Sequence, residues 1–329
     1  MSLLSVRELS VAFPSARGVV RAVTDVSLTV GPGETVALVG ESGCGKSSLG
    51  KAIMRLAPIA AGTVSIEGTD ITTLGPRALR PFRPRVQMIF QDPYSSLNPR
   101  HTVGEIIGQP LAVAGRPRAE IRERVAAVMA RVGLAADAAA RYPHEFSGGQ
   151  RQRVGIARAL VLNPKVVICD EPVSALDVSV RAQVINLLRD LQQDFGVSYL
   201  FISHDLSVVE HVADRVLVMY LGRVVESGPA AEIFASPAHP YTRALIEAAP
   251  VANPRLARTR SRTILGGELP SPLKPPAGCA FHARCPFAQA VCRERAPRLE
   301  PGASGRAVAC HFPLLPPIGA AALADRLDA

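Results

Sequence analysis

The sequence predicts an α/β fold built around buried parallel strands, and three observations carry this prediction. Two short runs, residues 35–40 and 166–169, are continuously apolar and end at Gly or Asp, as expected of parallel strands buried on both faces. Each run leads into a segment of helical character. Alternating apolar and polar residues over 3–13 and 23–30 predict a second, antiparallel sheet with one exposed face.

The composition is that of a folded protein without membrane-spanning segments. Hydrophobic residues make up 48% of the 329 residues and charged residues 20%, which excludes a disordered chain. No apolar run approaches the roughly 20 residues needed to cross a bilayer. The N-terminus lacks the basic and apolar segments of a secretory signal. We therefore expect a cytoplasmic protein that reaches a membrane only through partners.

The net charge of +9 comes mainly from arginine, since only four of the 37 basic residues are lysines. Such a balance is compatible with binding to nucleic acid, anionic lipid or nucleotide phosphates. The arginines are scattered and form no block of five or six, which favours ordinary solvated surface charge.

Two changes of pattern divide the chain. Between the two buried runs the sequence is mainly helical, with apolar residues at helical spacing over 116–134. From Ser236 onward proline recurs and the periodicity fades. We predict a main domain over 1–240, with a helical subdomain over about 92–165. An irregular extension covers 241–329.

A phosphate-binding loop follows the first buried strand. Residues 40–47 read Gly-Glu-Ser-Gly-Cys-Gly-Lys-Ser, which matches G-x-x-x-x-G-K-[ST] between a strand and a helix. Glycines let backbone N–H groups converge on phosphate oxygens, and the helix N-terminus adds a favourable dipole. Lys46 is predicted to contact the β- and γ-phosphates and the Ser47 hydroxyl to bind Mg²⁺. Cys44 contributes its backbone, and we regard its thiol as incidental.

Two carboxylates, Asp170 and Glu171, end the second buried strand. The carboxyl ends of parallel strands lie at one edge of a sheet, so both are expected beside the phosphate-binding loop. Asp170 would hold Mg²⁺ through water, and Glu171 is the natural general base for the attacking water. A carboxylate pair at a strand end is also a common helix cap, and the phosphate-binding loop decides between these interpretations.

A second anion-binding motif is Ser147-Gly-Gly-Gln150. Ser147 is a suitable N-cap, and the glycines expose backbone N–H groups at a helix N-terminus. One nucleotide cannot reach both motifs of the same chain if they lie on separate subdomains. This predicts a dimer in which each ATP lies between the phosphate-binding loop of one chain and residues 147–150 of another.

With these motifs the sequence resembles the ABC ATPases, and the other motifs of that family follow in order. Gln91 matches the Q-loop, which touches Mg²⁺ and water and links the nucleotide site to a membrane subunit. Asp177 matches the D-loop, which reaches across the dimer, and His204 matches the switch histidine at the γ-phosphate. Phe13 matches the aromatic residue that stacks on adenine, with a core position as the alternative.

The resemblance implies a P-loop NTPase fold of the ABC ATPase type. It consists of a RecA-like core, an antiparallel β subdomain and a helical subdomain, here with a small irregular Cys-rich C-terminal extension. The implied catalytic residues are Glu171, His204 and Gln91, and Ser47 and Gln91 are the implied Mg²⁺ contacts. The implied nucleotide contacts are Phe13, Gly40, Glu41, Ser42, Gly43, Cys44, Gly45, Lys46, Ser47, Ser48, Asp170, Ser147, Gly148, Gly149, Gln150 and Asp177.

Three further segments, residues 91–99, 142–146 and 239–245, resemble the oligopeptide/dipeptide (peptide/nickel) importer branch of this family. The branch implies a peripheral protein at the cytoplasmic face of the cell membrane that hydrolyses ATP to drive import of di- or oligopeptides. Its implied partners are a second, homologous ATPase in a heterodimer, two transmembrane permeases and an extracytoplasmic solute-binding protein, with no nucleic acid.

Two alternatives remain open at this stage. Nickel, glutathione and some sugar importers share the same branch, so the solute is not fixed. A soluble ABC ATPase acting on DNA or the ribosome is the other alternative. Such proteins usually carry two cassettes, a coiled-coil insertion or zinc modules, and this chain has one cassette with none of these.

Four cysteines crowd into the extension with the spacing C-x₅-C-x₆-C-x₁₇-C, at Cys279, Cys285, Cys292 and Cys310. Four thiolates can bind Zn²⁺ or an iron–sulfur cluster, and a cytosolic location argues against disulfides. The resemblance to peptide importers implies a 4Fe–4S cluster, with zinc as the alternative and four reduced core cysteines as the third reading. We expect a structural role, and a redox-sensing module is the competing hypothesis.

Overall fold

The computed structural model describes residues 2–16, 18–249, 270–271, 273, 275–302 and 305–314. A poorly structured connector is predicted for 250–275, and most of it lies outside the described residues. The end of the predicted extension, 315–329, lies outside them as well.

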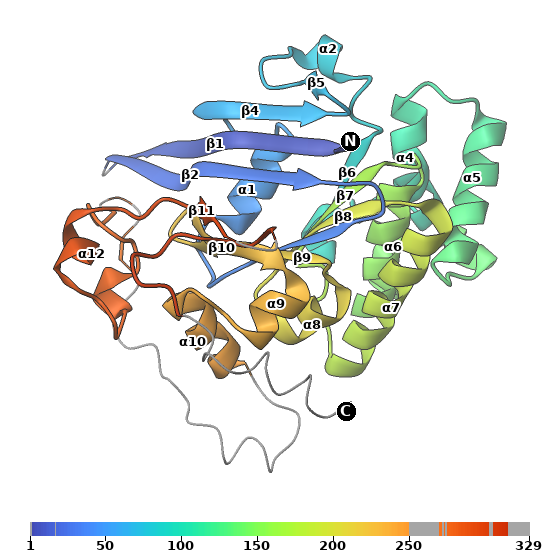
Figure 1. Ribbon diagram of the computed structural model, residues 1–329. Helices are drawn as coiled ribbons and strands as arrows, with labels where there is room; N and C mark the ends of the chain where they lie inside the picture. Colours follow the sequence, from blue (N-terminus) through green and yellow to red (C-terminus); the bar gives the residue numbers. More distant parts are fainter. Residues whose placement is uncertain are drawn as a thin grey trace, which may run out of the picture.

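The described residues form two sheets, with one helix between them (Figure 1). The larger sheet has the order β11-β12-β10-β9-β3-β8-β7-β6. Its parallel part consists of β3 (Thr35–Val39), β6 (Val86–Ile89), β7 (Val166–Asp170), β8 (Ser198–Ser203) and β9 (Arg215–Tyr220). Every residue of β3, β7 and β8 is buried, which confirms that the apolar runs are interior parallel strands.

The smaller sheet is antiparallel, in the order β2-β1-β4-β5. Its strands are β1 (Leu4–Ser15), β2 (Gly18–Val30), β4 (Ala61–Ile66) and β5 (Thr69–Asp70). The inward-facing residues of β1 pack with Leu49 and Ile53 of α1 (Lys46–Ile53) and with Leu200 of β8 in one apolar cluster. The helix that follows the phosphate-binding loop is thus covered on both sides.

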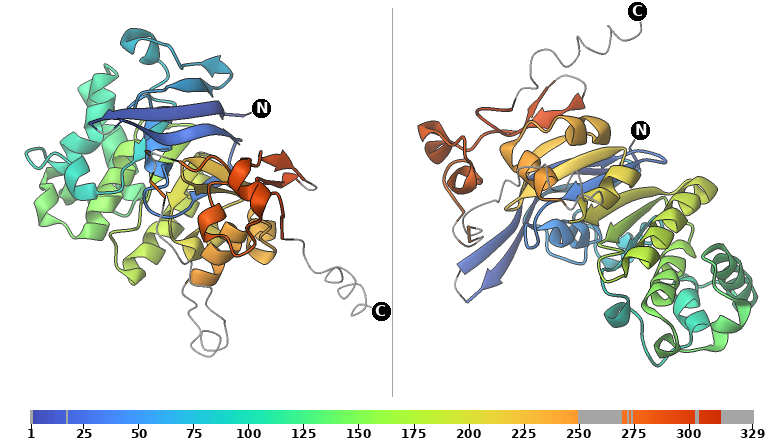
Figure 2. Two further views of the ribbon diagram at one scale, coloured as in Figure 1. Left: turned by 90° about the vertical axis from the view of Figure 1, so that its left-hand side faces the viewer. Right: turned by 90° about the horizontal axis from the view of Figure 1, so that it is seen from below.

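A group of helices lies at one end of the molecule (Figure 2). It contains α3 (Pro93–Ser96), α4 (Val103–Val113), α5 (Arg118–Arg131), η1 (Ala136–Ala140), η2 (Pro143–Glu145) and α6 (Gly148–Leu160). Its buried faces, with Ile106 of α4 and Val128 of α5, belong to the same core cluster as the parallel strands. The last long helix, α7 (Val178–Phe195), ends at Gly196, whose φ of 61° allows the left-handed turn that stops it.

Helix α2 (Pro76–Leu79) lies beside the small sheet, and α8 (Leu206–Val212) lies near α7 (Figure 1). The elements after β9 lie on the side away from the helical group (Figures 1 and 2). They are β10 (Arg223–Pro229), α9 (Ala230–Ala235), α10 (Pro240–Ala248), η3 (His282–Arg284), α12 (Ala290–Glu294), β11 (Glu300–Pro301) and β12 (Ala307–Val308). Among the described helices none is both long and apolar enough to span a membrane.

The extension is less irregular than the sequence suggests. Strand β12 pairs antiparallel with β10, placing Val308 opposite Glu226 and Ala307 opposite Ser227. Strand β11 pairs in turn with β12, so the extension continues the core sheet. Sequence analysis missed these strands because two residues are too few to show alternation.

Candidate active site

The phosphate-binding loop joins β3 to α1 in a conformation that requires glycine at two positions. Gly40 and Gly45 have φ values of 152° and 106°. A Cβ on Gly40 would lie 2.2 Å from the Met219 carbonyl oxygen, and one on Gly45 would lie 2.1 Å from that of Ala22. Both glycines are therefore required by close packing against neighbouring strands as well as by backbone conformation.

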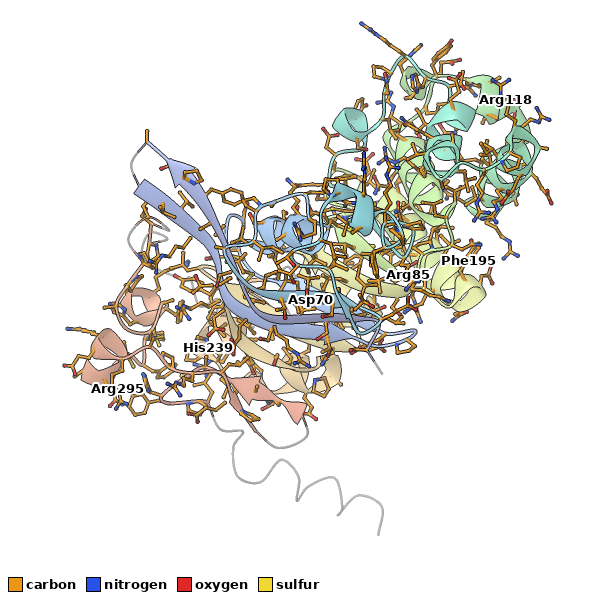
Figure 3. All side chains as sticks on the ribbon, turned by 90° about the horizontal axis from the view of Figure 1, so that it is seen from above. Asp70, Arg85, Arg118, Phe195, His239 and Arg295 are labelled. Carbon is orange, nitrogen blue, oxygen red and sulfur yellow. The ribbon has the colours of Figure 1, made fainter. Side chains whose placement is uncertain are left out.

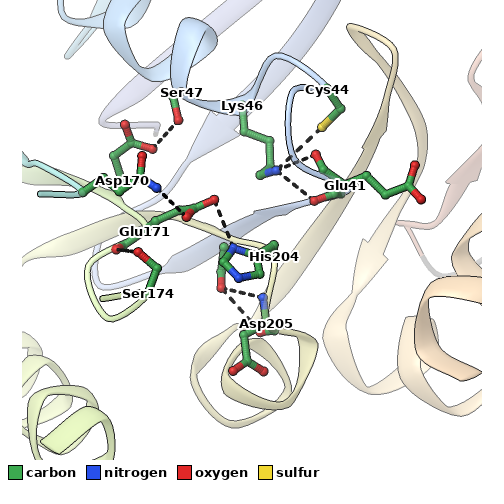
Figure 4. Close-up of polar contacts among 12 residues, drawn as sticks. Glu41, Cys44, Lys46, Ser47, Asp170, Glu171, Ser174, His204 and Asp205 are labelled. Atoms are coloured by element: carbon green, nitrogen blue, oxygen red, sulfur yellow. Dashed lines mark hydrogen bonds and ion pairs between the residues drawn. The ribbon is translucent and has the colours of Figure 1, made fainter. Parts of the chain in front are cut away.

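Lys46 folds back over this loop. Its Nζ donates hydrogen bonds to the carbonyl oxygens of Gly40 (2.8 Å) and Glu41 (2.9 Å), and the residue is only 4% exposed (Figure 4). The third neighbour is the Cys44 sulfur at 3.8 Å, a weak acceptor. Burial raises the pKa of the Cys44 thiol, so it stays neutral beside the ammonium. A phosphate would supply the anionic partner that a buried ammonium needs.

Ser47 and Asp170 form a pair of oxygen ligands next to the loop. The Ser47 hydroxyl donates to the Asp170 Oδ1 at 2.7 Å, and Asp170 is 3% exposed. Burial raises the pKa of the Asp170 carboxyl, because the charged form loses its hydration. Hydroxyl and carboxylate oxygens suit Mg²⁺, and a bound cation would offset the cost of burying this carboxylate.

Three side chains that the sequence assigns to hydrolysis converge at the ends of adjacent strands. Gln91 follows β6, Glu171 follows β7 and His204 follows β8. Gln91 Nε2 donates to Glu171 Oε2 at 2.9 Å, and His204 Nδ1 lies 3.1 Å from Glu171 Oε1. Figure 4 shows the contact with His204 on one side of Glu171 and the Ser47–Asp170 pair on the other.

The backbone of Glu171 takes an unusual conformation that directs its side chain. Its φ is 46°, in the left-handed region that a non-glycine residue rarely adopts. The Glu171 amide donates to the Ile202 carbonyl at 3.0 Å, and the Ser174 hydroxyl donates to the Glu171 carbonyl at 3.1 Å. Strain of this kind clusters at functional sites, where neighbouring structure holds it in place.

A cavity of about 320 Å³ lies over the loop, a size typical of small-molecule sites. Ten of the predicted residues line it, namely Phe13, Ser42, Gly43, Cys44, Gly45, Lys46, Ser47, Ser48, Gln91 and Glu171. Gly40, Glu41, Asp170 and His204 are not among its lining residues. Sequence reasoning missed five other lining residues, Val20, Arg21, Ala22, Leu221 and Gly222, which belong to no recognisable motif.

The second anion-binding motif is built but lies apart from this cavity. Ser147 caps α6, its hydroxyl accepting from the Gln150 amide (3.3 Å) while the Ser147 amide donates to Gln150 Oε1 (3.0 Å). A Cβ on Gly149 would lie 2.5 Å from a Val180 methyl group. None of residues 147–150 lines the cavity, and neither does the exposed Asp177. The chain thus carries the two predicted anion-binding motifs without bringing them together.

The four extension cysteines line a second, smaller cavity. His239, Phe281 and Phe312 share this lining, and Figure 3 shows His239 where the extension packs against the core. Burial, and then the electrostatic effect of the other three cysteines, raise the pKa of the Cys310 thiol to about 11. The Cys279 amide donates to the Cys292 carbonyl at 2.8 Å, which draws two of the segments together.

These thiols do not form a finished metal site as they stand. Among the described residues, no group of three or more His, Cys, Asp or Glu side chains is placed to hold a metal ion. All four cysteines are free thiols. The donor set fits a thiophilic metal or cluster chemically.

Comparison with protein-family models gives two matches. Residues 23–174 match the model described as "ABC transporter", and residues 225–292 match "Oligopeptide/dipeptide transporter, C-terminal region". The second match overlaps the described part of the extension.

Curated relatives match the chain over nearly its whole length. A probable peptide ABC transporter ATP-binding protein, y4tS of Sinorhizobium fredii, is 55% identical, covering 94% of this chain and 90% of the relative. The oligopeptide transport ATP-binding proteins AppF of Bacillus subtilis and OppF of Escherichia coli are each 50% identical over 94% of this chain, covering 97% and 95% of their own lengths.

Solved structures share the architecture. CbiO1 of Clostridium perfringens, part of the ABC transporter complex CbiONQ, aligns with a TM-score of 0.64 at 29% identity, covering 71% of this chain and 91% of its own. The ATP-binding cassette MJ0796, in a post-hydrolysis dimer bound to ADP and phosphate, aligns with a TM-score of 0.63 at 27% identity, covering 69% and 98%.

Proposed function

Because this chain belongs to the ABC transporter family as an ATP-hydrolysing subunit, we propose that it energises import of di- and oligopeptides across the cytoplasmic membrane. The observation that carries the catalytic part is the convergence of Gln91, Glu171 and His204 beside the cavity over the phosphate-binding loop. The peptide substrate is supported by the relatives' names and by the match of residues 225–292.

Each residue of the site has a distinct part in the proposed mechanism. Lys46 and the loop amides bind the phosphates, and Phe13 at the cavity wall stacks on the adenine. Ser47, Asp170 and Gln91 would hold Mg²⁺, which neutralises charge on the phosphate oxygens when bound.

Hydrolysis depends on the carboxylate that Gln91 and His204 hold in place. Glu171 orients the attacking water and accepts a proton from it as the oxygen attacks the γ-phosphorus. The bond from the γ-phosphorus to the oxygen that bridges it to the β-phosphate breaks, and ADP leaves. His204 is 53% exposed at its side chain, so it can leave Glu171 and contact the γ-phosphate when ATP binds.

A complete site would need a second chain. We infer that Ser147, Gly148, Gly149 and Gln150 of one ATPase contact ATP on the other, with Asp177 reaching across the interface. This is supported by the separation of residues 147–150 from the cavity and by the exposure of Asp177. The favoured partner is a second, homologous ATPase rather than an identical copy.

The same proposal gives the remaining partners, the location and the domain limits. Two permeases and a solute-binding protein complete the importer, and the chain is peripheral at the cytoplasmic face of the membrane. The ATPase domain covers 1–240, with its helical subdomain at about 92–165, and the extension covers 241–329.

Transport in proteoliposomes tests the substrate. Vesicles are prepared with this chain, the second ATPase, both permeases and the solute-binding protein. Peptide-stimulated ATP hydrolysis together with peptide uptake is expected. Stimulation by nickel or a sugar and not by peptides would contradict the peptide assignment and leave the ATPase assignment intact.

For the cysteine cavity we propose a bound 4Fe–4S cluster, with Zn²⁺ as the alternative, held by Cys279, Cys285, Cys292 and Cys310. The shared cavity supports it, and so does the effect of the neighbouring cysteines on the pKa of Cys310. The test is the absorption spectrum and metal content of anaerobically purified protein. A broad absorption band at about 400 nm is expected for a cluster. One zinc per chain without that band would assign zinc instead.

A further inference from the structure

An ion pair joins the extension to the phosphate-binding loop. Arg284, at the end of η3, donates from Nη1 to Glu41 Oε2 (2.7 Å) and from Nη2 to Glu41 Oε1 (2.9 Å). Glu41 is the second residue of the loop, and the two residues are 243 positions apart in sequence. The side chains are only 6% and 22% exposed, so this two-bond contact is shielded from most solvent screening.

A second contact holds the backbone of the same residue. The Glu41 amide donates to the Tyr241 hydroxyl at 2.9 Å. Tyr241 packs against Tyr220 and Phe281, with ring centroids 4.6 Å and 5.3 Å away. Phe281 belongs to the extension and immediately precedes η3, so the aromatic cluster fixes Tyr241 and the approach of Arg284 together.

Glu41 passes this restraint to the catalytic lysine. Its carbonyl oxygen accepts the Lys46 Nζ at 2.9 Å, while its side chain extends away from Lys46 (Figure 4). The side chain, amide and carbonyl of Glu41 are therefore held by Arg284, Tyr241 and Lys46 in turn. A shift of the Glu41 backbone would move an acceptor that positions the Lys46 ammonium.

We propose that Arg284 and Tyr241 are positioning residues of the nucleotide site, so that nucleotide affinity and the seating of the extension are energetically coupled. Arg284 immediately precedes Cys285, so a change at the cysteine cavity reaches Lys46 through only two residues, Arg284 and Glu41. Coupling of this kind is reciprocal: bound nucleotide must stabilise the extension by as much as the extension strengthens nucleotide binding.

The contact is not required merely to dock the extension, because a separate anchor does so. Glu226 of β10 is fully buried and pairs with Arg306 at 2.5 Å. The same carboxylate accepts from the amides of Ala238 (2.8 Å) and His239 (2.9 Å). With strand β12 paired to β10, the extension keeps its place when Arg284 is changed.

Binding of AMP-PNP with Mg²⁺ to the full-length chain, measured by titration calorimetry, tests the coupling. Arg284→Gln is expected to weaken binding roughly fivefold or more, the lower end of typical coupling between sites. Arg284→Lys keeps the charge but loses the two-bond geometry, so an intermediate loss is expected. The matched control is Arg293→Gln, an exposed arginine of α12 in the same extension, which should bind as the wild type does.

A double-mutant cycle separates positioning from general damage. If Arg284 acts through Glu41, the double variant Glu41→Gln, Arg284→Gln should bind AMP-PNP with the same affinity as whichever single variant binds it less tightly. Fully additive losses would contradict action through Glu41. Unchanged affinity in Arg284→Gln, or an equal loss in Arg293→Gln, would overturn the proposal.

Hydrogen exchange gives a readout that a purely structural role would not move. AMP-PNP should slow amide exchange over 279–292 in the wild type and leave it unchanged in Arg284→Gln. Equal protection in both proteins would contradict the coupling. The inference rests on nucleotide binding in the proposed function, but not on peptides as solute. A wild-type chain that binds no AMP-PNP would refute the nucleotide site itself, whereas binding insensitive to Arg284 would refute only the coupling.

Discussion

The nucleotide site and the cysteine cavity are built in opposite ways. Gln91, Glu171 and His204 follow three adjacent parallel strands, so the core sheet sets their spacing directly. Cys292 comes from the five-residue helix α12, and the other three cysteines come from loops. These segments are held to the core by Arg284, Arg306 and one short strand pair. The comparison shows that the core sheet holds the nucleotide site rigidly. The geometry of the cysteine cavity depends instead on the contacts that dock the extension and on any group bound there.

The two sites also differ in how their polar groups are satisfied. In the nucleotide site Lys46, Ser47 and Glu171 already have hydrogen-bond or ion-pair partners. In the cysteine cavity burial raises the pKa of Cys279, Cys285 and Cys310, so these thiols are neutral without a metal. Changes in the first site should therefore affect chemistry, and changes in the second should affect stability.

The largest effect is expected from Glu171→Gln. The amide keeps the shape of the side chain but cannot accept a proton, so ATP hydrolysis should fall by about 10²–10⁴-fold. AMP-PNP binding should stay close to that of the wild type. Phosphate release and calorimetry measure the two quantities, and hydrolysis at the wild-type rate would remove Glu171 as the base.

Lys46→Ala should weaken ATP binding about tenfold to a hundredfold, because this corresponds to the free energy that one hydrogen bond to a charged group contributes. The loop and its glycines remain, so the melting temperature should change little. Lys165→Ala, an exposed lysine before β7, is the control and should bind normally. Equal affinities for the two variants would contradict the phosphate role of Lys46.

Metal removal should separate the two sites. Cys285→Ser with Cys310→Ser, or treatment with a strong chelator, should lower the melting temperature by at least about 3 °C, because the proposed metal would stabilise the folded extension. Fast hydrogen exchange should appear over 279–310. Loss of metal with unchanged stability and a new redox response of ATPase activity would favour the redox-sensing hypothesis.

The smallest effect concerns His239, which is 1% exposed. Burial lowers its pKa from 6.5 to about 4. The unfolded chain therefore binds a proton at a higher pH than the folded chain does. The free energy of unfolding is not affected by His239 well above pH 6.5, and it decreases as the pH falls from there towards 4. Between pH 7.5 and 5.5 the free energy of unfolding should drop by about 1 kcal/mol from this residue. His239→Phe should flatten that drop in denaturant titrations, and an unchanged pH slope would contradict the assignment.

The sequence predicts most of the core because its signals are local. Continuous apolar runs identified β3 and β7, and the phosphate-binding loop is recognisable from eight consecutive residues. The order of strands in the sheet cannot be inferred from local sequence patterns. From the sequence, the proximity of Gln91, Glu171 and His204 is therefore predicted only by the family resemblance.

What the sequence could not predict depends on distant partners. Arg21 lines the cavity from a strand without a motif, and Arg284 reaches Glu41 across 243 positions. The pairing of β12 with β10 involves two residues per strand, below the length at which periodicity is visible. The four cysteines were predicted to share one site and they line one cavity, but the presence of His239 in the same lining was not predicted.

The central claim is that ATP is bound between the loop of one ATPase and residues 147–150 of another. Sedimentation velocity of Glu171→Gln, mixed with the second ATPase of the transporter, tests it most directly. Mg–ATP should convert the mixture to a stable pair, and adding Ser147→Arg to the Glu171→Gln chain should abolish that conversion. Identical sedimentation with and without ATP, or pairing that survives Ser147→Arg, would contradict the account.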